Sequence, residues 1–360
     1  MRNKLTILLL AVILMVNITG CRQTKYEKHS DSFFGSFDTY TAIVGYTQSE
    51  KEFETYFNLI NSRFAELHKL YDKYNTYDGI NNIKTINDNA GIKPVKVEKE
   101  IIDLILFSKE WYSKTNGKVN IALGPVLEIW HDYFVDAQYD PGNTGIPSME
   151  KLKAASLLTD INKVIIDEEN RTVFLKEKGM SLDVGAVAKG FATEIVAREV
   201  EEAGFVSGIL SPGGNIRVIG QPMDGVRQRW GIGIQDPDKP VVNDVENTLD
   251  IIYINDASVV SSGDYQRYYT HDGKRIHHII DPDTLMPGDN FRSVTVVAED
   301  AGIADYLSTA LFLLSYEEGL TLVENLEGIE AVWVMPDKTI RFSDGMKSML
   351  RSQGATATTE

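Results

Sequence analysis

The chain has very little cysteine: Cys21 is the single cysteine among 360 residues. One cysteine cannot form an intramolecular disulfide or a thiolate metal site. If Cys21 is itself modified, as argued below, no cysteine remains for catalysis. Stability must therefore come from an ordinary packed core, and a hydrophobic content of 43% supports a sizeable one.

Positive charge is also scarce. The chain has 36 Lys and Arg residues against 52 Asp and Glu residues, which gives a formal net charge of −16. This excess would repel the phosphates of a nucleic acid, so we expect no nucleic-acid partner. An anionic ligand would need a bound cation or a local basic patch to offset the same field.

The apolar run at residues 5–16 is too short for a comfortable membrane span, which needs about 20 apolar residues. Arg2 and Lys4 precede the run, and Ile18-Thr19-Gly20 leads directly into Cys21. This pattern predicts a lipoprotein signal peptide over residues 1–20, cleaved before a lipidated Cys21. The protein would then be lipid-anchored on the extracytoplasmic face of the cell membrane; a transmembrane anchor is the alternative.

The rest of the chain divides into three parts by composition. Residues 22–31 are polar and charged and indicate a flexible tether. Residues 32–345 have the composition of a folded region, which we expect to be one large domain with two lobes sharing a cleft. Residues 346–360 are predicted to be a flexible tail. No internal repeat or low-complexity block interrupts the folded region.

Hydrophobic periodicity predicts an α+β fold with mixed or antiparallel sheets and flanking helices, because helices dominate the first part of the domain and strands the last. Predicted helices cover residues 50–74, 99–115, 188–204 and 302–314. Predicted strands cover residues 33–46, 171–176, 180–183, 207–210, 216–219, 230–234, 249–254, 258–261, 276–280 and 293–297, followed by a final pair.

Residues 181–194 form the most informative segment. A carboxylate (Asp183), glycines (Gly185 and Gly190) and a lysine (Lys189) stand where a strand is expected to give way to a helix. Glycines let backbone come close to a ligand, and the free N–H groups of a helix start favour phosphate oxygens. The alternative is a tight turn with an incidental lysine, because the spacing matches no established phosphate-binding motif.

Asp305 and Thr309 lie four residues apart in the helix predicted at 302–314, so they share one face. A carboxylate and a hydroxyl form an oxygen pair suited to Mg²⁺. An exposed helix face, with an acid near its N-terminus, is the alternative.

His277 and His278 lie in a predicted strand, where neighbouring side chains point to opposite faces. At most one of them can therefore face a given site, where it could act as a general base. The alternative is a histidine satisfied by a neighbouring carbonyl.

Two glycine-rich turns, residues 211–215 and 261–265, could expose backbone donors to a ribose or phosphate, or could be simple hairpin turns. Several aromatic residues could stack on a planar ring, although aromatics more often pack in a core: these are Tyr74, Tyr77, Trp130 and Tyr265.

Five ordered motifs resemble the ApbE family of FAD:protein FMN transferases, over about residues 34–342. They are Ser-Leu-Asp-Val-Gly-Ala-Val-Ala-Lys-Gly at 181–190, Gly-Gly-Asn at 213–215, Ser-Ser-Gly-Asp-Tyr at 261–265, His-Ile-Ile-Asp-Pro at 278–282 followed by Pro287-Gly288, and Ala-Asp-Tyr-Leu-Ser-Thr-Ala at 304–310. Three positions depart from the family pattern: Phe34-Gly35-Ser36 replaces Met-Gly-Thr, Asn120 replaces an aspartate, and Ala186 replaces a glycine.

The resemblance implies an ApbE-like domain with its active site in the cleft, and Mg²⁺-dependent transfer of FMN from FAD to a Thr or Ser hydroxyl of an extracytoplasmic protein, with release of AMP. It implies that His278 is the base and that the metal ligands are Asp305, Thr309 and the main-chain oxygen of Ala186. It implies flavin-nucleotide contacts at Tyr74, Asp183, Lys189, Gly214, Ser262, Gly263, Asp264 and Tyr265. The implied partners are exported or membrane redox proteins with a Ser-Gly-Ala-Thr-like acceptor motif.

Two other functions remain open at this stage: a Mg²⁺-dependent FAD pyrophosphatase, in which water replaces the acceptor hydroxyl, and a flavin-binding lipoprotein without turnover. The C-terminal residues 352–358 resemble the same acceptor motif with Gln353 inserted, which suggests that Thr356 could itself receive FMN. A disordered tail of small polar residues is the alternative.

Overall fold

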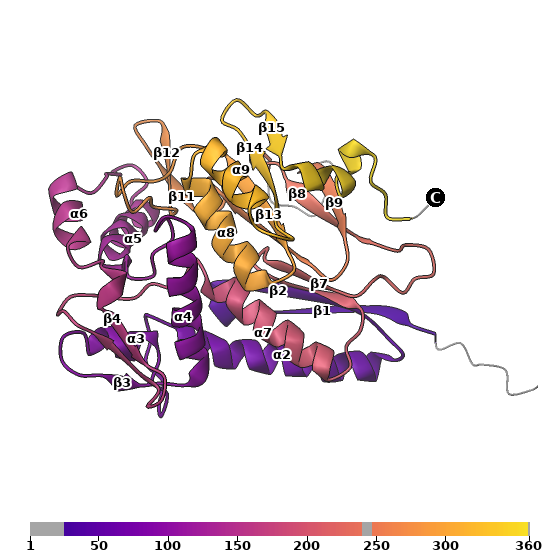
Figure 1. Cartoon of the computed structure of the whole chain (residues 1–360), viewed down its shortest axis with the longest axis horizontal. Helices are drawn as coiled ribbons and strands as arrows, with labels where there is room; N and C mark the ends of the chain where they lie inside the picture. Colours follow the sequence, from indigo (N-terminus) through magenta and orange to yellow (C-terminus); the bar gives the residue numbers. More distant parts are fainter. Residues whose placement is uncertain (1–24, 240–246, 359–360) are drawn as a thin grey trace, which may run out of the picture.

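The computed structural model describes residues 25–239 and 247–358 of the chain (Figure 1). Its centre is an eight-stranded sheet in the order β1-β2-β6-β7-β10-β13-β14-β15, and every neighbouring pair is antiparallel. The strands are β1 (Glu27–Phe34), β2 (Tyr40–Thr47), β6 (Gly208–Pro212), β7 (Ile216–Ile219), β10 (Ser258–Gly263), β13 (Ser293–Ala298), β14 (Glu330–Val334) and β15 (Ile340–Phe342).

One face of this sheet is covered by helices α2 (Glu50–Tyr71), α7 (Ala188–Glu202) and α8 (Ala301–Leu313) (Figure 1). Ser49 caps the start of α2 by accepting from the Glu52 N–H, and apolar residues at helical spacing face the core. Helix α8 is buried along almost its whole length, which explains why its sequence is nearly all apolar. The main hydrophobic core lies between this layer and the sheet.

The other face of the sheet packs against a hairpin of β8 (Trp230–Gln235) and β9 (Thr248–Ile254). Alternation along the central strands assigns side chains to the two faces: Val296 faces the helices, whereas Val297 joins the β8–β9 core. Strand β13 is buried at all six positions for this reason.

Most of the remaining elements lie beside the sheet and helix layers in Figure 1. The exceptions are the helix at residues 316–324, which packs on the main core, and the turns at residues 344–353, which lie against the β8–β9 core. The helices are α3 (Ile83–Asp88), α4 (Lys99–Lys114), α5 (Gly124–Tyr139), α6 (Met149–Ser156) and α9 (Tyr316–Glu324), with short 3₁₀ turns η1 (Ser36–Asp38), η2 (Ile161–Lys163), η4 (Asp344–Ser348) and η5 (Arg351–Gln353). Strands β3 (Val95–Lys96), β5 (Thr172–Leu175) and β4 (Val164–Asp167) form a small sheet in that order, and β11 (Tyr268–His271) pairs with β12 (Lys274–His277).

The α+β class with antiparallel sheets is confirmed, but several predicted boundaries are wrong. The strand expected at 33–46 is two strands, β1 and β2, because Gly35 turns the chain at a φ of 117°. No strand forms at 180–183, where the chain runs as a loop into α7. The tether predicted at 22–31 overlaps β1, an edge strand whose polar sequence, EKHSDSFF, hides it from periodicity analysis.

The flexible tail predicted at 346–360 is also wrong over its described part. Met346 and Leu350 are buried in the β8–β9 core, and Ala357 O accepts the N–H groups of Gln228 (2.8 Å) and Arg229 (3.1 Å). The Thr356 side chain itself is exposed. Small polar composition alone could not reveal that the sheet offers this segment a docking surface.

The predicted signal peptide, with Cys21, lies outside the described residues. Among the residues that the structure does describe, no helix has the length and apolarity needed to span a bilayer.

Several elements end or begin at one end of the central sheet, and they bring the sequence motifs together there. Strands β1, β6 and β10 end at this side, whereas β2 and α7 begin there. The turn after β6 is tied to the start of β2 by Gly213 N–H donating to Tyr40 O (3.0 Å). The antiparallel topology thus places loops that are more than 200 residues apart in the chain at the same end of the sheet.

Candidate active site

Asp305 of α8 provides a buried carboxylate at this end of the sheet. Its side chain is only 4% exposed, and its Oδ2 accepts the backbone N–H of Gly190 at 2.8 Å. In an uninterrupted helix that N–H would bond to the carbonyl of Ala186, four residues earlier. Helix α7 begins only at Ala188, so Asp305 gives this N–H the partner that the helix does not, and the Ala186 carbonyl stays outside the helical hydrogen bonds.

Gly190 is required for the close approach of α7 and α8. A Cβ at this position would lie 2.3 Å from Ala301 O and 2.3 Å from the Cβ of Asp305. Both distances are far below van der Waals contact, so any side chain would force the helices apart. The Gly in the motif is thus explained by helix packing as well as by the N–H that Asp305 needs.

Hydroxyl groups surround Thr309 on the next turn of α8. Ser262 Oγ, at the end of β10, lies 2.8 Å from Ser308 Oγ and 3.3 Å from Thr309 Oγ1. Both Asp305 and Thr309 belong to α8, four residues apart as predicted, and these contacts place Thr309 next to the end of β10.

Lys189 supplies the positive charge of this cluster, with its Nζ 3.9 Å from Asp305 Oδ1. Burial raises the pKa of the Asp305 carboxyl, while Lys189 and the Gly190 N–H favour its ionised form. The buried Nδ2 of Asn215 lies near the same carboxyl, but beyond hydrogen-bonding distance of it and of every other partner among the described residues. A negative charge held in so buried a place favours a cationic ligand.

The donor set fits a hard divalent cation. Carboxylate, hydroxyl and main-chain carbonyl oxygens are typical ligands of Mg²⁺, which completes its shell with water or substrate oxygens. No group of three or more His, Cys, Asp or Glu side chains suited to a metal occurs in residues 25–239 and 247–358.

The two neighbouring histidines have different environments. His277 is buried at 4% exposure; its Nε2 lies 2.6 Å from Gly288 O, and its Nδ1 accepts the Ile279 N–H at 3.2 Å. Both ring nitrogens are therefore used within the protein. His277 matches the alternative of a histidine satisfied by a carbonyl, and its neighbour is the one that remains available.

His278 is reached by solvent, and its Nδ1 lies 3.2 Å from the carbonyl oxygen of Arg267. A carbonyl can only accept, so this contact places the proton on Nδ1 and leaves Nε2 with a lone pair. The surrounding protein still disfavours a charged ring: desolvation, followed by the positive charge of Arg267, lowers the pKa of His278 to about 3. The free lone pair allows Nε2 to accept a proton, whereas so low a pKa makes the ring a weak base in the absence of a ligand.

A second charge pair lies where the chain enters the same loop. Lys73 Nζ donates to Asp183 Oδ2 at 2.6 Å, and Asp183 Oδ1 accepts the Gly185 N–H at 2.9 Å. Burial opposes the charge of Lys73, but attraction to Asp183 prevails and raises the pKa of the lysine. Lys73 also lies 4.7 Å from the ring centre of Tyr74, which is 54% exposed.

Asp72 shapes the turn that presents Lys73 and Tyr74. Its carboxylate accepts the N–H groups of Tyr74 (2.6 Å) and Asn75 (3.1 Å) and the hydroxyl of Tyr77 (2.7 Å). Tyr77 therefore stabilises this turn through its hydroxyl and does not form part of a stacking surface. Trp130 is likewise buried, with its Nε1 donating to Leu285 O at 3.0 Å. Of the aromatics weighed above, Tyr74 is the exposed one.

The two glycine-rich turns differ in what they offer. Gly213 and Gly214 both have positive φ, 57° and 88°, and nothing lies within 4 Å of a Cβ built on Gly214. This turn therefore presents open backbone. In the other turn a Cβ on Gly263 would lie 2.4 Å from the Tyr265 ring, and burial raises the pKa of Tyr265 to about 12. Asp264 is held by two arginines, as described below.

Sequence reasoning missed several residues that complete these clusters. They are Asp72, Lys73, Asn215, Arg275 and Arg292, whose contacts cross between elements far apart in the chain. Lys73 could have been suspected from its position next to Tyr74, and Asn215 from its place after two glycines. The arginines carry no sequence signal of their own.

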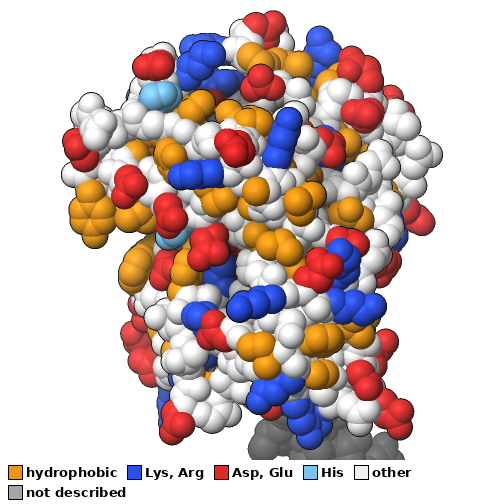
Figure 2. Space-filling view, turned by 90° about the vertical axis from the view of Figure 1, so that its left-hand side faces the viewer, with side chains coloured by type: hydrophobic (Ala, Val, Ile, Leu, Met, Phe, Trp, Pro, Cys, Tyr) orange, Lys and Arg blue, Asp and Glu red, His pale blue; other side chains and the backbone are white. Residues whose placement is uncertain are grey.

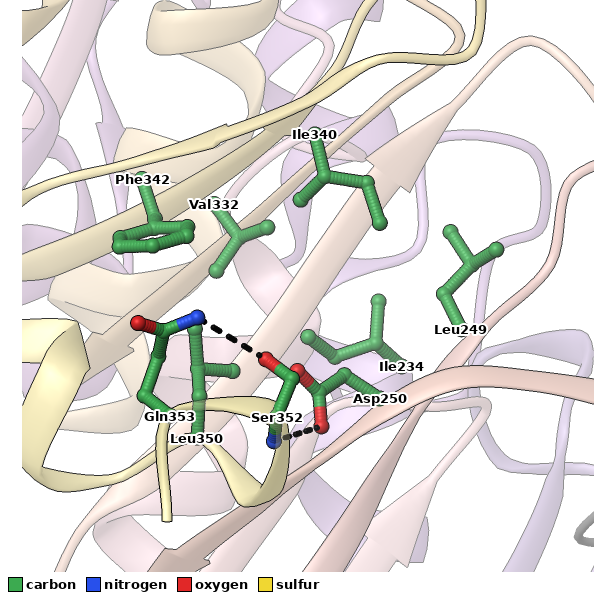
Figure 3. A pocket seen from close by; sticks show the side chains of 9 residues that line it. All are labelled: Ile234, Leu249, Asp250, Val332, Ile340, Phe342, Leu350, Ser352 and Gln353. Atoms are coloured by element: carbon green, nitrogen blue, oxygen red, sulfur yellow. Dashed lines mark hydrogen bonds between the residues drawn. The ribbon is translucent and has the colours of Figure 1, made fainter. Parts of the chain in front are cut away.

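Two cavities lie elsewhere. One of about 220 Å³ is lined by β8, β9, β14, β15 and the C-terminal turn (Figure 3), and one of about 530 Å³ lies beside Glu194 of α7 and Asp300 before α8. Neither is lined by a predicted site residue, so the expectation of a site within a cleft stays a prediction. On the face shown in Figure 2, acidic and basic side chains are intermingled and no continuous basic surface is seen.

An oxygen-rich ligand set, a lysine at a helix start and a neutral histidine define the class of enzyme that acts on phosphate esters. Comparison with known proteins gives the family: the model of the ApbE family matches residues 37–333, and the chain belongs to this family.

Similar proteins and structures agree with this assignment. A FAD:protein FMN transferase of Klebsiella pneumoniae (strain 342) is 32% identical over 284 residues, which are 78% of this chain and 84% of that protein. A protein of the same name from Treponema pallidum (strain Nichols) is 32% identical over 285 residues, 75% of each chain. The crystal structure of the ApbE protein of Thermotoga maritima superposes with a TM-score of 0.76 at 28% identity, covering 90% of this chain and 98% of that one.

Proposed function

We propose that this protein transfers FMN from FAD to a threonine or serine hydroxyl of a target protein through a phosphoester bond, with release of AMP. Its relatives in Klebsiella pneumoniae and Treponema pallidum bear the name FAD:protein FMN transferase. The observation that carries the proposal is the bond from the Gly190 N–H to Asp305, because it holds a buried carboxylate beside Lys189 at the start of α7.

Mg²⁺ is the proposed metal, held by Asp305, Thr309 and the main-chain oxygen of Ala186. The buried carboxylate of Asp305, the hydroxyl of Thr309 and the position of Ala186 just before α7 support this assignment. When bound, the ion would polarise the FAD diphosphate and offset the negative charge that develops on it. Its two positive charges would also reduce the negative field that an anionic ligand meets at the site.

His278 is the proposed general base. The acceptor hydroxyl gives its proton to Nε2, its oxygen forms a bond to the phosphorus of the FMN half, and the bond from that phosphorus to the AMP phosphate breaks. The electron pair of the broken bond leaves on AMP. A hydroxyl is a poor nucleophile at neutral pH, so the base is needed, and the cation of Lys189 would stabilise the charge on the phosphates.

The flavin is proposed to lie against Tyr74 and Asp183. The ring of Tyr74 is exposed and can stack on isoalloxazine, and Lys73 fixes Asp183 beside it. Gly214 offers open backbone, and the Ser262 hydroxyl lies next to Thr309. The turn at 262–265 would close the nucleotide side of the site.

We further propose that the protein works as a lipoprotein on the extracytoplasmic face of the membrane, attached through Cys21, and that its acceptors are exported or membrane redox proteins with a Ser-Gly-Ala-Thr-like motif. The basis is the apolar run and the small residues before Cys21. A Cys21→Ser variant should move from the membrane to the soluble fraction, as followed by fractionation and labelling with a radioactive fatty acid. Full membrane retention without label would contradict the anchor.

The decisive test incubates the protein with FAD and Mg²⁺, with and without an acceptor domain that carries the motif. AMP release and the intact mass of the acceptor are measured together. We expect one FMN gained for each AMP released. AMP without a mass gain would indicate a pyrophosphatase, and bound FAD without AMP would indicate a carrier. The mass of the enzyme itself, compared with a Thr356→Ala variant, tests whether Thr356 accepts FMN.

The two adjacent histidines provide matched variants for the same assay. His278→Gln should lower the transfer rate by roughly 10²–10⁴-fold, the usual contribution of a general base, with FAD affinity little changed. His277→Gln should instead lower the melting temperature, because its two hydrogen bonds are internal. If the His278 variant kept the full transfer rate, the proposed role of His278 as the base would be wrong.

A further inference from the structure

The loop that joins β10 to β11 connects the metal-side hydroxyls to the histidine. It leaves the sheet after Gly263, next to Ser262, and reaches Arg267, whose carbonyl contacts His278 Nδ1 at 3.2 Å. The position of that carbonyl therefore decides which nitrogen of His278 carries the proton. What fixes this loop also fixes the tautomer of the ring.

Asp264 is the residue that fixes the loop. Its Oδ1 accepts from Arg275 Nη1 at 2.9 Å and its Oδ2 from Arg292 Nε at 2.8 Å, and its side chain is only 14% exposed. Its backbone N–H also donates to Arg292 O at 3.0 Å. Each carboxylate oxygen already has a charged partner, so Asp264 is poorly placed to serve a ligand.

The two arginines anchor the loop to different strands. Arg275 belongs to β12, three residues before His278, and its guanidinium lies 4.5 Å from the ring centre of Tyr268. Arg292 precedes β13, and its backbone N–H donates to Val334 O at 2.8 Å. A charge-assisted bond to each arginine thus ties the loop both to the histidine strand and to the central sheet.

We propose that Asp264, together with Arg275, is a positioning residue that holds the Arg267 carbonyl against His278 Nδ1 and so keeps the Nε2 lone pair available. This replaces the direct flavin contact that the motif predicted for Asp264. The inference rests on the proposed base role of His278, because only a base needs the free lone pair. The opposite tautomer would place the proton on Nε2, where the acceptor hydroxyl must deliver its own.

The test reads the tautomer directly. Full-length protein labelled with ¹⁵N-histidine is examined by long-range ¹H–¹⁵N NMR, with His278 assigned by its loss in His278→Gln. We expect the wild-type ring to carry its proton on Nδ1. In Asp264→Asn the two nitrogen shifts should move towards a mixture of tautomers, and the transfer rate should fall on the order of 10-fold, less than the 10²–10⁴ of a lost base.

Asp238→Asn is the matched control. Asp238 also pairs with Arg292, through Nη2 at 2.9 Å, but it lies outside the loop that reaches His278. The control should keep both the tautomer and the transfer rate. If Asp264→Asn fails to fold, Arg275→Gln replaces it, because that variant leaves the Asp264–Arg292 pair intact.

The outcomes separate this inference from the proposed function. A wild-type ring protonated on Nε2, or an Asp264 variant that loses transfer with no change in the His278 shifts, would overturn the positioning role. A shift change in Asp264→Asn would support it even if the wild-type protein transferred no FMN, in which case the proposed function alone would fail.

Discussion

Asp305 and Asp300 form a matched pair at the scale of single residues. Asp305 faces the proposed metal, whereas Asp300 caps α8 through the Ile303 N–H at 3.0 Å. Asp305→Asn should lower Mg²⁺-dependent transfer on the order of 10³-fold, since the metal supplies several kcal/mol of charge stabilisation. Asp300→Asn should keep the activity, because asparagine is also a good N-cap. Isothermal titration with Mg²⁺ and the transfer assay would check both, and equal losses in the two variants would contradict the metal role.

The lowered pKa of His278 has a consequence for pH dependence. An imidazole in the unfolded chain titrates near pH 6.5. The pKa of His278 is lower in the folded protein, so on acidification the unfolded chain takes up the proton first. The contribution of His278 to the stability of the folded state is therefore full above pH 6.5. It decreases as the pH falls from 6.5 towards 3. We therefore expect the His278 ring signals to stay constant from pH 8 to pH 5. A titration midpoint inside that range would show that desolvation and the nearby positive charge of Arg267 do not lower the pKa of the ring as described.

Two of the helical glycines, Gly190 and Gly319, test how closely the helices pack against their neighbours. An alanine at 190 would press on Ala301 O and Asp305 at 2.3 Å, so Gly190→Ala should separate α7 from α8, cost roughly 1–3 kcal/mol of stability and abolish tight Mg²⁺ binding. At Gly319 the nearest atom is the flexible Leu311 Cδ2 at 3.3 Å, so Gly319→Ala should be neutral or stabilise α9 by up to about 1 kcal/mol. Urea unfolding of both variants would show whether the effects differ in this way.

Some elements could be predicted from the sequence because their own pattern determines them. Strand β7 was predicted with its observed bounds, and α8 to within a residue, since both carry a strong apolar pattern. Strand β1 could not be found, because an edge strand that is polar on most positions has no periodicity to detect. Its strand conformation comes from pairing with β2, which is a tertiary effect.

The candidate site divides in the same way. The i, i+4 spacing of Asp305 and Thr309 and the opposite faces of His277 and His278 follow from local geometry, so the sequence contains them. Partners such as Lys73 for Asp183 are 110 residues apart, and only the folded chain brings them within 2.6 Å. The assignment of the base to His278 and not to His277 likewise depends on their contacts with Arg267 and Gly288. These contacts cannot be predicted from the local sequence pattern.

At the scale of the whole molecule, the C-terminal segment is part of the second core. Leu350 is 1% exposed, and its packing against the β8–β9 hairpin closes that core. Leu350→Ala should therefore cost about 2–5 kcal/mol of unfolding free energy, the usual range for a buried leucine. Thr358→Ala, at an exposed position of the same segment, serves as the control. Equal urea midpoints for the two variants would contradict this prediction and would indicate that the segment is a flexible tail.

Strand β1 begins at Glu27, only six residues after Cys21, and it runs towards the active-site end of the sheet. If the lipid is attached at Cys21, residues 22–26 can span at most about 18 Å, at 3.3–3.6 Å per residue. The eight residues of β1 then add roughly 25 Å between the anchored end and the catalytic end. The short linker and the rigid strand would together limit how far the active site can lie from the bilayer. A membrane-bound acceptor would then have to present its hydroxyl within a few tens of ångströms of the lipid surface.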